Sequence, residues 1–196
     1  MIQAERDAEI VAQSASLSHC LQIMDGCVWI VWLLEDGRRQ ITEFLFPGDV
    51  FGLDMLPGES LAAEAVTAVT LRRIPHAVIE KRASSDLGFA QGLLKHGAAQ
   101  VRAARTRCVL LGRKTASERV ASFLLEMQGK LGSCAKGGLA LPMSRTDIAD
   151  YLGLTTETVC RALAELRQRR VIRVERSRIE ILDQTGLERA GSDCVH

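Results

Sequence analysis

The spacing of apolar and polar positions changes along the chain and predicts three regions. From residue 8 to 75, short apolar runs are broken by turn signals: Leu21–Met24 precedes Asp25-Gly26, and Cys27–Leu34 precedes Glu35-Asp36-Gly37. Asp-Gly between two apolar runs predicts a β-hairpin. Several short strands at this spacing predict an antiparallel sandwich or roll.

The pattern becomes helical after Pro75, which fits the first turn of a short helix through about Arg82. A long helix is then predicted over 89–114. Two sets of residues repeat every seven positions on it: Leu94, Val101 and Cys108, and Gly97, Ala104 and Leu111. Such a seam packs against its own domain or against a second copy of the helix. Polar and basic residues outside the seam favour the second interpretation, a dimer.

A third region runs from Thr115 to about Asp183. An amphipathic helix is predicted from Ser117 to Met127, followed by a loop, two helices and a two-stranded element. Glycines mark the loop: Gly129, Gly132, Gly137 and Gly138. The predicted domains are a β-roll over 1–88, a long helix suited to dimerisation over 89–114, a mainly helical domain over 115–185 and a flexible tail over 186–196. The fold class is therefore α+β.

The stretch from 141 to 166 carries the most specific pattern. Ser144 followed by Asp147 has the spacing of a helix N-cap with a capping box, and Thr155 or Thr156 can cap the next helix. A helix-turn-helix needs a small residue at the helix contact, a glycine in the turn and an apolar residue in the second helix, and Ala149, Gly153 and Val159 supply them. The alternative is an ordinary helical hairpin.

The second helix of such a motif places its N-terminal residues in the major groove of DNA. Glu157, Cys160 and Arg161 face outward there, as candidate base-reading residues. Arginine reads guanine, and a carboxylate accepts a hydrogen bond from cytosine. The alternative for Glu157 and Arg161, four positions apart, is a surface ion pair. Three hydroxyl residues are candidates for phosphate contacts: Ser144, Thr156 and Thr158.

Basic residues accumulate beyond this helix. The alternating segment from Val171 to Leu182 predicts a hairpin, the wing of a winged helix. Between 161 and 178 only Glu165 and Glu175 oppose seven arginines: Arg161, Arg167, Arg169, Arg170, Arg173, Arg176 and Arg178. The cluster is either an electrostatic footprint for DNA or a solvated helix face.

Composition narrows the function further. The hydrophobic fraction of 47% and the charged fraction of 25% are typical of a packed soluble protein, and the net charge of +1 decides nothing. No apolar run is long enough to span a membrane and no signal peptide begins the chain, so a cytoplasmic location is expected. No catalytic triad, phosphate-binding glycine loop or metal-ligand spacing appears, so we expect neither an enzyme nor a bound cofactor.

From Met143 to Arg161 the residues resemble the DNA-binding signature of the Crp/Fnr regulators, and are most similar to the Fnr and FixK branches. Gly48-Asp-Val-Phe-Gly-Leu resembles the glycine-bearing turn of that family's sensor roll. The resemblance implies a β-roll, a dimer helix and a winged helix-turn-helix. It also implies a homodimer that activates transcription on a TTGAT-N4-ATCAA-like palindrome and contacts RNA polymerase, with Glu157 and Arg161 as base readers. The physiological role it implies is control of microaerobic or nitrogen-fixation genes.

Four departures from the family matter. Cys160 stands where the family usually has serine, which puts a thiol at the DNA surface. The Fnr iron–sulfur cluster needs four thiolates, whereas only Cys20 and Cys27 lie near the N-terminus. The stretch Gly58–Ala65 has no arginine for a cyclic-nucleotide phosphate. The N-terminus is short by a strand or two, so the roll is either truncated or a degenerate scaffold.

These departures leave two hypotheses. The first is a ligand-free activator of the FixK type. The second is a sensor in which oxidation of Cys160 sets the DNA affinity, or in which haem binds through His76 or Cys20. An inert thiol at position 160 and a structural His76 are the alternatives to the second hypothesis.

Overall fold

The chain was analysed as a computed structural model, which describes residues 1–13, 15, 17–53, 61–132, 138–175 and 178–191. The chain divides into two compact units, Met1–Cys108 and Val109–His196. Each unit is described separately below. Within the described ranges, no helix combines the length and the hydropathy needed to cross a bilayer.

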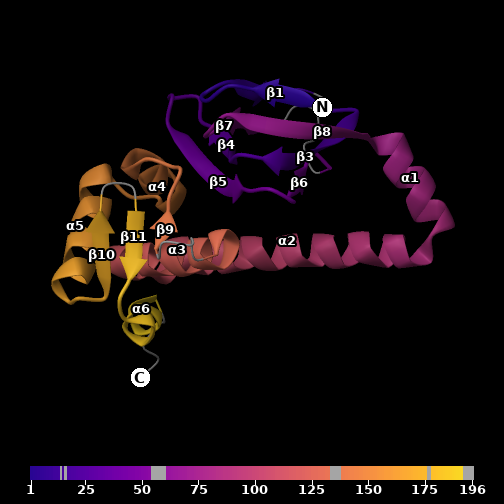
Figure 1. Cartoon of the computed structure of the whole chain (residues 1–196). Coiled ribbons are helices and arrows are strands. Elements are labelled where there is room, and N and C mark those ends of the chain that lie inside the picture. The colour runs from indigo at the N-terminus through magenta and orange to yellow at the C-terminus, as the bar shows by residue number, and fades with distance from the viewer. Residues whose placement is uncertain (14, 16, 54–60, 133–137, 176–177, 192–196) are drawn as a thin grey trace. The chain divides into compact units, whose positions relative to one another are not determined.

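The first unit contains two antiparallel sheets (Figure 1). One has the order β1-β8-β3-β6 and the other the order β2-β7-β4-β5. The strands are β1 (Ile2–Ala4), β2 (Glu9–Val11), β3 (His19–Asp25), β4 (Val28–Leu33), β5 (Arg39–Leu45), β6 (Val50–Phe51), β7 (Leu61–Ala65) and β8 (Val69–Pro75). The α+β fold with a β-roll, predicted from the sequence, is confirmed.

The core of the first unit is built from the inward-facing residues of both sheets. Leu21 and Leu71 of one sheet and Val28 and Ala63 of the other belong to a single buried cluster. Burying these apolar side chains supplies the main driving force for closing the roll. Strands β1 and β2, which the hydrophobic pattern did not predict, form an edge of each sheet and pair with β8 and β7.

The two Asp-Gly turns have different structural roles. Asp36-Gly37 closes a hairpin between β4 and β5, as predicted. Asp25-Gly26 instead leads from β3 into β4, which lies in the other sheet, so no hairpin forms there. Gly26 has a φ of 89°, and a Cβ at this position would lie within 3 Å of Val69 and Thr67. The glycine is needed because this turn crosses between sheets against another loop.

Two helices follow the strands of the first unit. Helix α1 (His76–Ser85) starts after Pro75, and α2 (Leu87–Arg113) is the long helix expected from the sequence. In α2 only Leu110 is buried. Most of the helix surface is therefore uncovered within the chain.

The second unit is a small helical domain with a three-stranded sheet of order β10-β11-β9. Its helices are α3 (Ala116–Leu131), α4 (Arg145–Leu152), α5 (Thr156–Gln168) and α6 (Gln184–Gly191), and its strands are β9 (Leu139–Ala140), β10 (Ile172–Glu175) and β11 (Arg178–Ile181). Phe123 and Tyr151 meet edge to face in its core, with ring centroids 5.7 Å apart. The Tyr151 hydroxyl donates to the carboxylate of Glu126 at 2.8 Å.

Three features of this unit differ from the sequence-based expectation. Gly129 lies inside α3 and not in the loop, whereas Gly137 lies outside the described residues. Strand β9 adds a third strand to the expected two. Part of the expected flexible tail forms α6, in which Leu187 is buried and Gly191 accepts a hydrogen bond from Ser122 Oγ at 3.1 Å. The apolar contact and the hydrogen bond order the segment.

Candidate nucleic-acid interface

Helix α4 begins and ends as its sequence predicts. Ser144 and Asp147 form the capping box: Asp147 N donates to Ser144 Oγ at 3.2 Å, and Ser144 N donates to Asp147 Oδ2 at 2.7 Å. Gly153 closes the helix in the left-handed conformation, with φ 61° and ψ 43°. The glycine lets the chain reverse into the next helix within a few residues.

Helix α5 is capped by Thr155 and not by Thr156, the other N-cap candidate from the sequence. Thr155 Oγ1 accepts from Thr158 N at 3.2 Å and lies 2.8 Å from Thr158 Oγ1. Thr156 is the first residue of the helix, and its hydroxyl donates to Thr146 Oγ1 of α4 at 3.4 Å. These contacts fix the N-terminal turn of α5 against α4.

The two sides of α5 differ sharply. Val159, Leu163 and Leu166 are buried, together with Ile148 and Ala149 of α4. This is the helix-turn-helix packing that the sequence predicted.

Glu157, Cys160 and Arg161 lie on the opposite side of α5, and all three are exposed. No ion pair joins Glu157 to Arg161 in the described part of the chain. Both charged groups are therefore available to a ligand.

Arg145 was missed by the sequence analysis. It is half-buried at the start of α4, and burial lowers the pKa of its guanidinium, while the charge of Cys160 acts in the opposite direction. An electrostatic interaction thus links Arg145 of α4 with Cys160 of α5. The sequence could have indicated this residue, because Arg145 directly follows Ser144, the predicted N-cap of the first helix.

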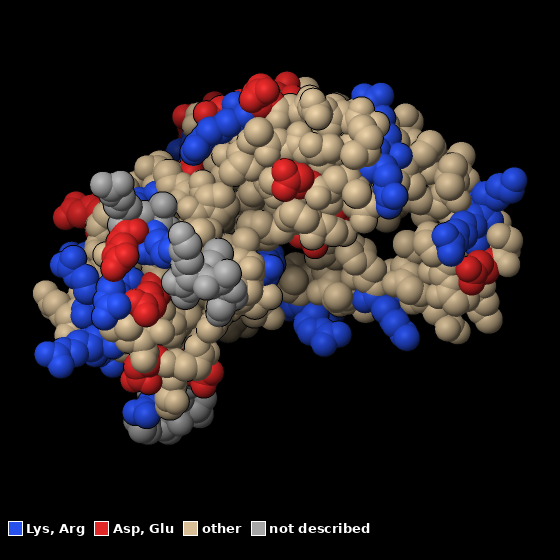
Figure 2. Space-filling model, viewed as in Figure 1, with Lys and Arg blue, Asp and Glu red and all other residues tan. Residues whose placement is uncertain are grey.

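The strands β10 and β11 add basic residues beside α5. Arg173 Nη1 is paired with Glu180 Oε2 across the strands at 2.6 Å, so part of its charge is neutralised. Figure 2 shows lysine and arginine side chains gathered over α5 and β10, with acidic side chains among them. Arg176, a member of the expected basic cluster, lies outside the described residues.

The predicted seam residues of α2 lie on an uncovered part of the helix. Leu94 is 74% exposed and Val101 51% exposed, and Gly97, Ala104 and Cys108 are exposed as well. Leu111, at the end of the helix, is half-buried. An apolar row that the chain itself does not cover is unusual for a helix of a folded protein.

Comparison with known proteins identifies this arrangement. A model of the Crp-like helix-turn-helix domain matches residues 118–190, and one of the cyclic nucleotide-binding domain matches residues 1–86. The nitrogen fixation regulation protein FixK of Azorhizobium caulinodans is 39% identical over 191 residues, which cover 95% of this chain and 77% of that protein. The chain belongs to the Crp/Fnr family.

Further relatives place this Crp/Fnr chain near FixK. The FixK protein of Rhizobium meliloti is 38% identical over 91% of this chain and 81% of its own length. The solved structure of FixK2 from Bradyrhizobium japonicum superimposes with a TM-score of 0.90 at 41% identity, covering 97% of this chain and 96% of that one. The protein is a transcriptional activator of the Crp/Fnr type, related to FixK, that binds DNA through its helix-turn-helix, and it is not an enzyme.

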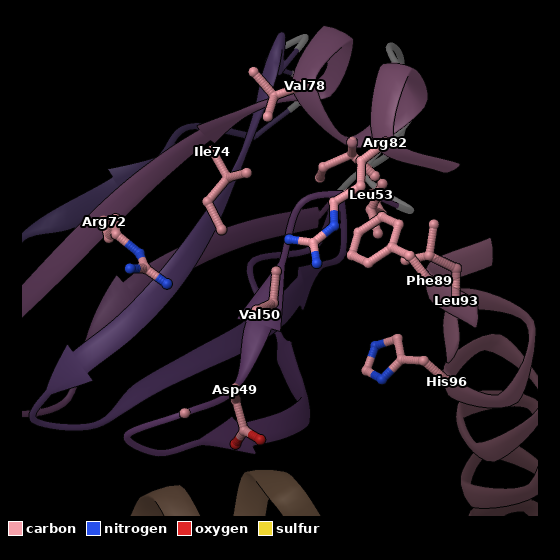
Figure 3. A pocket seen from close by; sticks show the side chains of 12 residues that line it. Asp49, Val50, Leu53, Arg72, Ile74, Val78, Arg82, Phe89, Leu93 and His96 are labelled. Atoms are coloured by element: carbon pink, nitrogen blue, oxygen red, sulfur yellow. The ribbon is translucent and has the colours of Figure 1, made fainter. Parts of the chain in front are cut away.

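The first unit of this Crp/Fnr chain contains a cavity of about 560 Å³. Its walls come from the β5–β6 turn, β8, α1 and α2, and Figure 3 shows Arg82 pointing into it beside Leu53 and Phe89. Both arginines of the wall have partners: Arg82 lies over the Phe89 ring at 4.8 Å, and Arg72 donates to Gln22. Of the stretch Gly58–Ala65, considered above for a cyclic nucleotide, the described residues 61–65 are not part of the wall, and residues 58–60 lie outside the described residues.

The two haem-ligand candidates have other roles in the fold. Cys20 is fully buried within β3. The Nε2 atom of His76 lies 3.1 Å from the carbonyl oxygen of Gly52 and so ties α1 to the roll. The geometry gives both side chains structural roles. Cys27, expected within a strand, lies in the turn just before β4, and Cys134 and Cys194 lie outside the described residues.

Proposed function

We propose that this Crp/Fnr protein binds a TTGAT-N4-ATCAA-like palindrome as a homodimer and reads its bases through Glu157, Cys160 and Arg161. The observation that carries the proposal is the two-sided burial of α5. Its apolar side is packed against α3 and α4, while these three side chains are exposed on the other side. A short, rigid helix with exposed charged groups near its N-terminus fits the major groove.

Each exposed side chain has a distinct role in this proposal. Arg161 donates two hydrogen bonds to O6 and N7 of a guanine, and Glu157 accepts from N4 of a cytosine. Cys160, on the same exposed side, touches the neighbouring base edge, where a thiol is only a weak hydrogen-bonding group.

Phosphate contacts come from hydroxyl groups at the starts of α4 and α5. Ser144 and Thr156 are exposed, and the Ser144 hydroxyl, which accepts the capping bond, still has its proton to donate. Thr158 is half-buried against Thr155 and can reach a phosphate from the same turn. Such contacts set the register of the protein on the duplex.

The homodimer is proposed from the exposed row on α2. Leu94, Val101 and Cys108 would meet their copies along two parallel helices, with Gly97 and Ala104 allowing a close approach. On this proposal the functional parts are a roll over 1–88, a dimer helix over 89–114 and a DNA-binding domain over 115–185. RNA polymerase is the proposed further partner.

The proposed activator works without a cyclic nucleotide and without an Fnr-type cluster. No lysine or arginine occurs between Gln40 and Leu71, so this part of the roll offers no cation to a phosphate. The two cysteines of the roll, Cys20 and Cys27, are both buried. Control of microaerobic or nitrogen-fixation genes is proposed from the FixK relatives.

The test is to select DNA from a random duplex pool with the purified full-length protein and to sequence what is retained. We expect a two-fold sequence with half-sites about 34 Å apart, and binding that weakens steeply as salt increases. Recovery of DNA without two-fold symmetry would contradict the proposed dimer. Recovery of no preferred sequence would contradict the assigned base readers.

A second candidate function, redox control through Cys160, is favoured by the exposure of this free thiol on α5. A peroxide would oxidise the thiolate to a sulfenic acid and release hydroxide, which adds bulk at the DNA-facing surface. A gel-shift titration with hydrogen peroxide on the wild type and on Cys160→Ser tests it. Equal loss of binding in both proteins would exclude Cys160.

A further inference from the structure

Arg119 makes hydrogen bonds to the ends of two different helices. It lies in the first turn of α3 and is half-buried. Its Nε donates to the carbonyl oxygen of Lys114 at 3.0 Å and its Nη2 to that of Leu111 at 2.8 Å. Its Nη1 donates to the carbonyl oxygen of Leu152 at 2.9 Å and more weakly to that of Gly153 at 3.5 Å.

The four acceptors share one property, because all are carbonyl oxygens at helix C-termini. Leu111 and Lys114 stand at the end of α2, and Leu152 and Gly153 at the end of α4. The last carbonyl groups of a helix lack partners within it and carry the negative end of its dipole. One guanidinium therefore joins the end of the long helix to the turn between α4 and α5.

We propose that Arg119 is a positioning residue that fixes the angle between the last turn of the dimer helix and the recognition helix, and so sets the half-site spacing that the protein accepts. The inference rests on the proposed function, a homodimer on a palindrome. Helix α5 starts three residues after Gly153 and is hydrogen-bonded to α4 through Thr156 and Thr146. A rotation of α4 about the end of α2 would therefore carry Glu157 and Arg161 with it.

Lys114 provides a contrast at the same junction. Its Nζ donates to Ser122 Oγ at 3.1 Å and also to the Gly191 carbonyl. These bonds connect the end of α2 to α3 and α6, and neither reaches α4. Lys114 is therefore suited as a matched control, since it stabilises the junction without contacting the helix-turn-helix.

The planar fork of arginine is essential to this role. Its nitrogens donate in fixed directions, which lets one side chain bond both helix ends at once. A lysine keeps the positive charge but presents one compact ammonium group. Arg119→Lys should thus lose the connection while it preserves the charge, and Arg119→Gln should lose both.

The experiment compares duplexes in which the two half-sites are separated by four base pairs with duplexes in which the separation is three or five. One base pair turns a half-site by about 34° and moves it by about 3.4 Å. For the wild type we expect at least about a 30-fold loss of affinity on either change. For Arg119→Lys and Arg119→Gln we expect the loss to fall below about 5-fold, and for Lys114→Gln to stay at the wild-type value.

Three further measurements separate the outcomes. For each variant, binding to a single half-site shows whether base reading persists. The dimer mass shows whether the dimer still assembles, and the melting temperature shows whether the protein still folds. A wild type that forms no dimer or prefers no palindrome would overturn the proposed function. A dimeric Arg119→Lys or Arg119→Gln with the wild-type spacing preference would overturn only the role of Arg119.

Discussion

Helices α2 and α5 both carry an apolar row, but the chain buries only one of them. In α5, Val159 and Leu166 are buried within the second unit, and Glu157 and Arg161 are exposed. In α2, Leu94 and Val101 are exposed themselves. The contrast teaches that an apolar row specifies a contact without specifying whether its partner belongs to the same chain. In α5 the partners are α3 and α4 of the same chain, and in α2 we propose a second copy.

The largest expected effect comes from placing charge on the uncovered row of α2. The double substitution Leu94→Glu and Val101→Glu should dissociate the dimer, because like charges facing one another across the seam cost several kcal/mol. Sedimentation equilibrium measures the dissociation constant, which we expect to rise at least about 100-fold.

The matched control for this substitution is Lys95→Glu, which is exposed on the same helix outside the seam. It should leave the dimer intact. A dimer that survives the double substitution unchanged would show that α2 does not carry the interface.

The next effect concerns the covered row of α5. Leu163→Ala removes a buried side chain and should cost about 2–5 kcal/mol of the free energy of unfolding. Urea denaturation followed by circular dichroism measures it, and Arg167→Ala, exposed on the same helix, should change the stability by less than about 0.5 kcal/mol. Similar values for both variants would contradict the packing described for α5.

A smaller effect is expected on the exposed side of α5. Arg161→Ala should cost about 1–3 kcal/mol of binding to the preferred palindrome and relax the preference at one base pair. Fluorescence anisotropy against operators substituted at each position measures this. Arg173→Ala, in contrast, should weaken binding to all sequences alike, and a base-specific loss there would assign the readout to the wing instead.

The smallest effect concerns the end of α5, where Arg170 has a φ of 58°. A left-handed conformation is unfavourable for a residue with a Cβ, so Arg170→Gly should raise the stability by up to about 1 kcal/mol. Arg169→Gly, at a φ of −73°, should lower it. Urea denaturation of both variants is the measurement, and a less stable Arg170→Gly would contradict the expectation.

The sequence predicted those parts of the fold that depend on local chemistry. The capping box of Ser144 and Asp147 and the left-handed Gly153 follow from properties of single residues and their nearest neighbours, and both are present. The hairpin at Asp36-Gly37 belongs to the same class. The exposed positions of Glu157 and Arg161 followed from helical periodicity, although their contacts with bases stay a prediction.

The sequence did not predict the features that depend on distant partners. The turn at Asp25-Gly26 has the composition of a hairpin, but its strands pair with β8 and β7, far away in the chain. Strands β1 and β9 are too short to show an alternating pattern. Arg119 gives no local signal either, because its role arises from carbonyl groups of two helices that meet only in the folded domain.

The edge position of β1 has a consequence for how the protein is made. Ile2 pairs with Leu71, so β1 leaves the ribosome well before its partner strand β8 has been synthesised. At roughly 5–20 residues per second this delay lasts several seconds. During that time the unpaired early strands are open to association with other nascent chains. Yield in the cell should therefore respond to translation speed and chaperone supply through this segment, more than through the locally determined helices made afterwards.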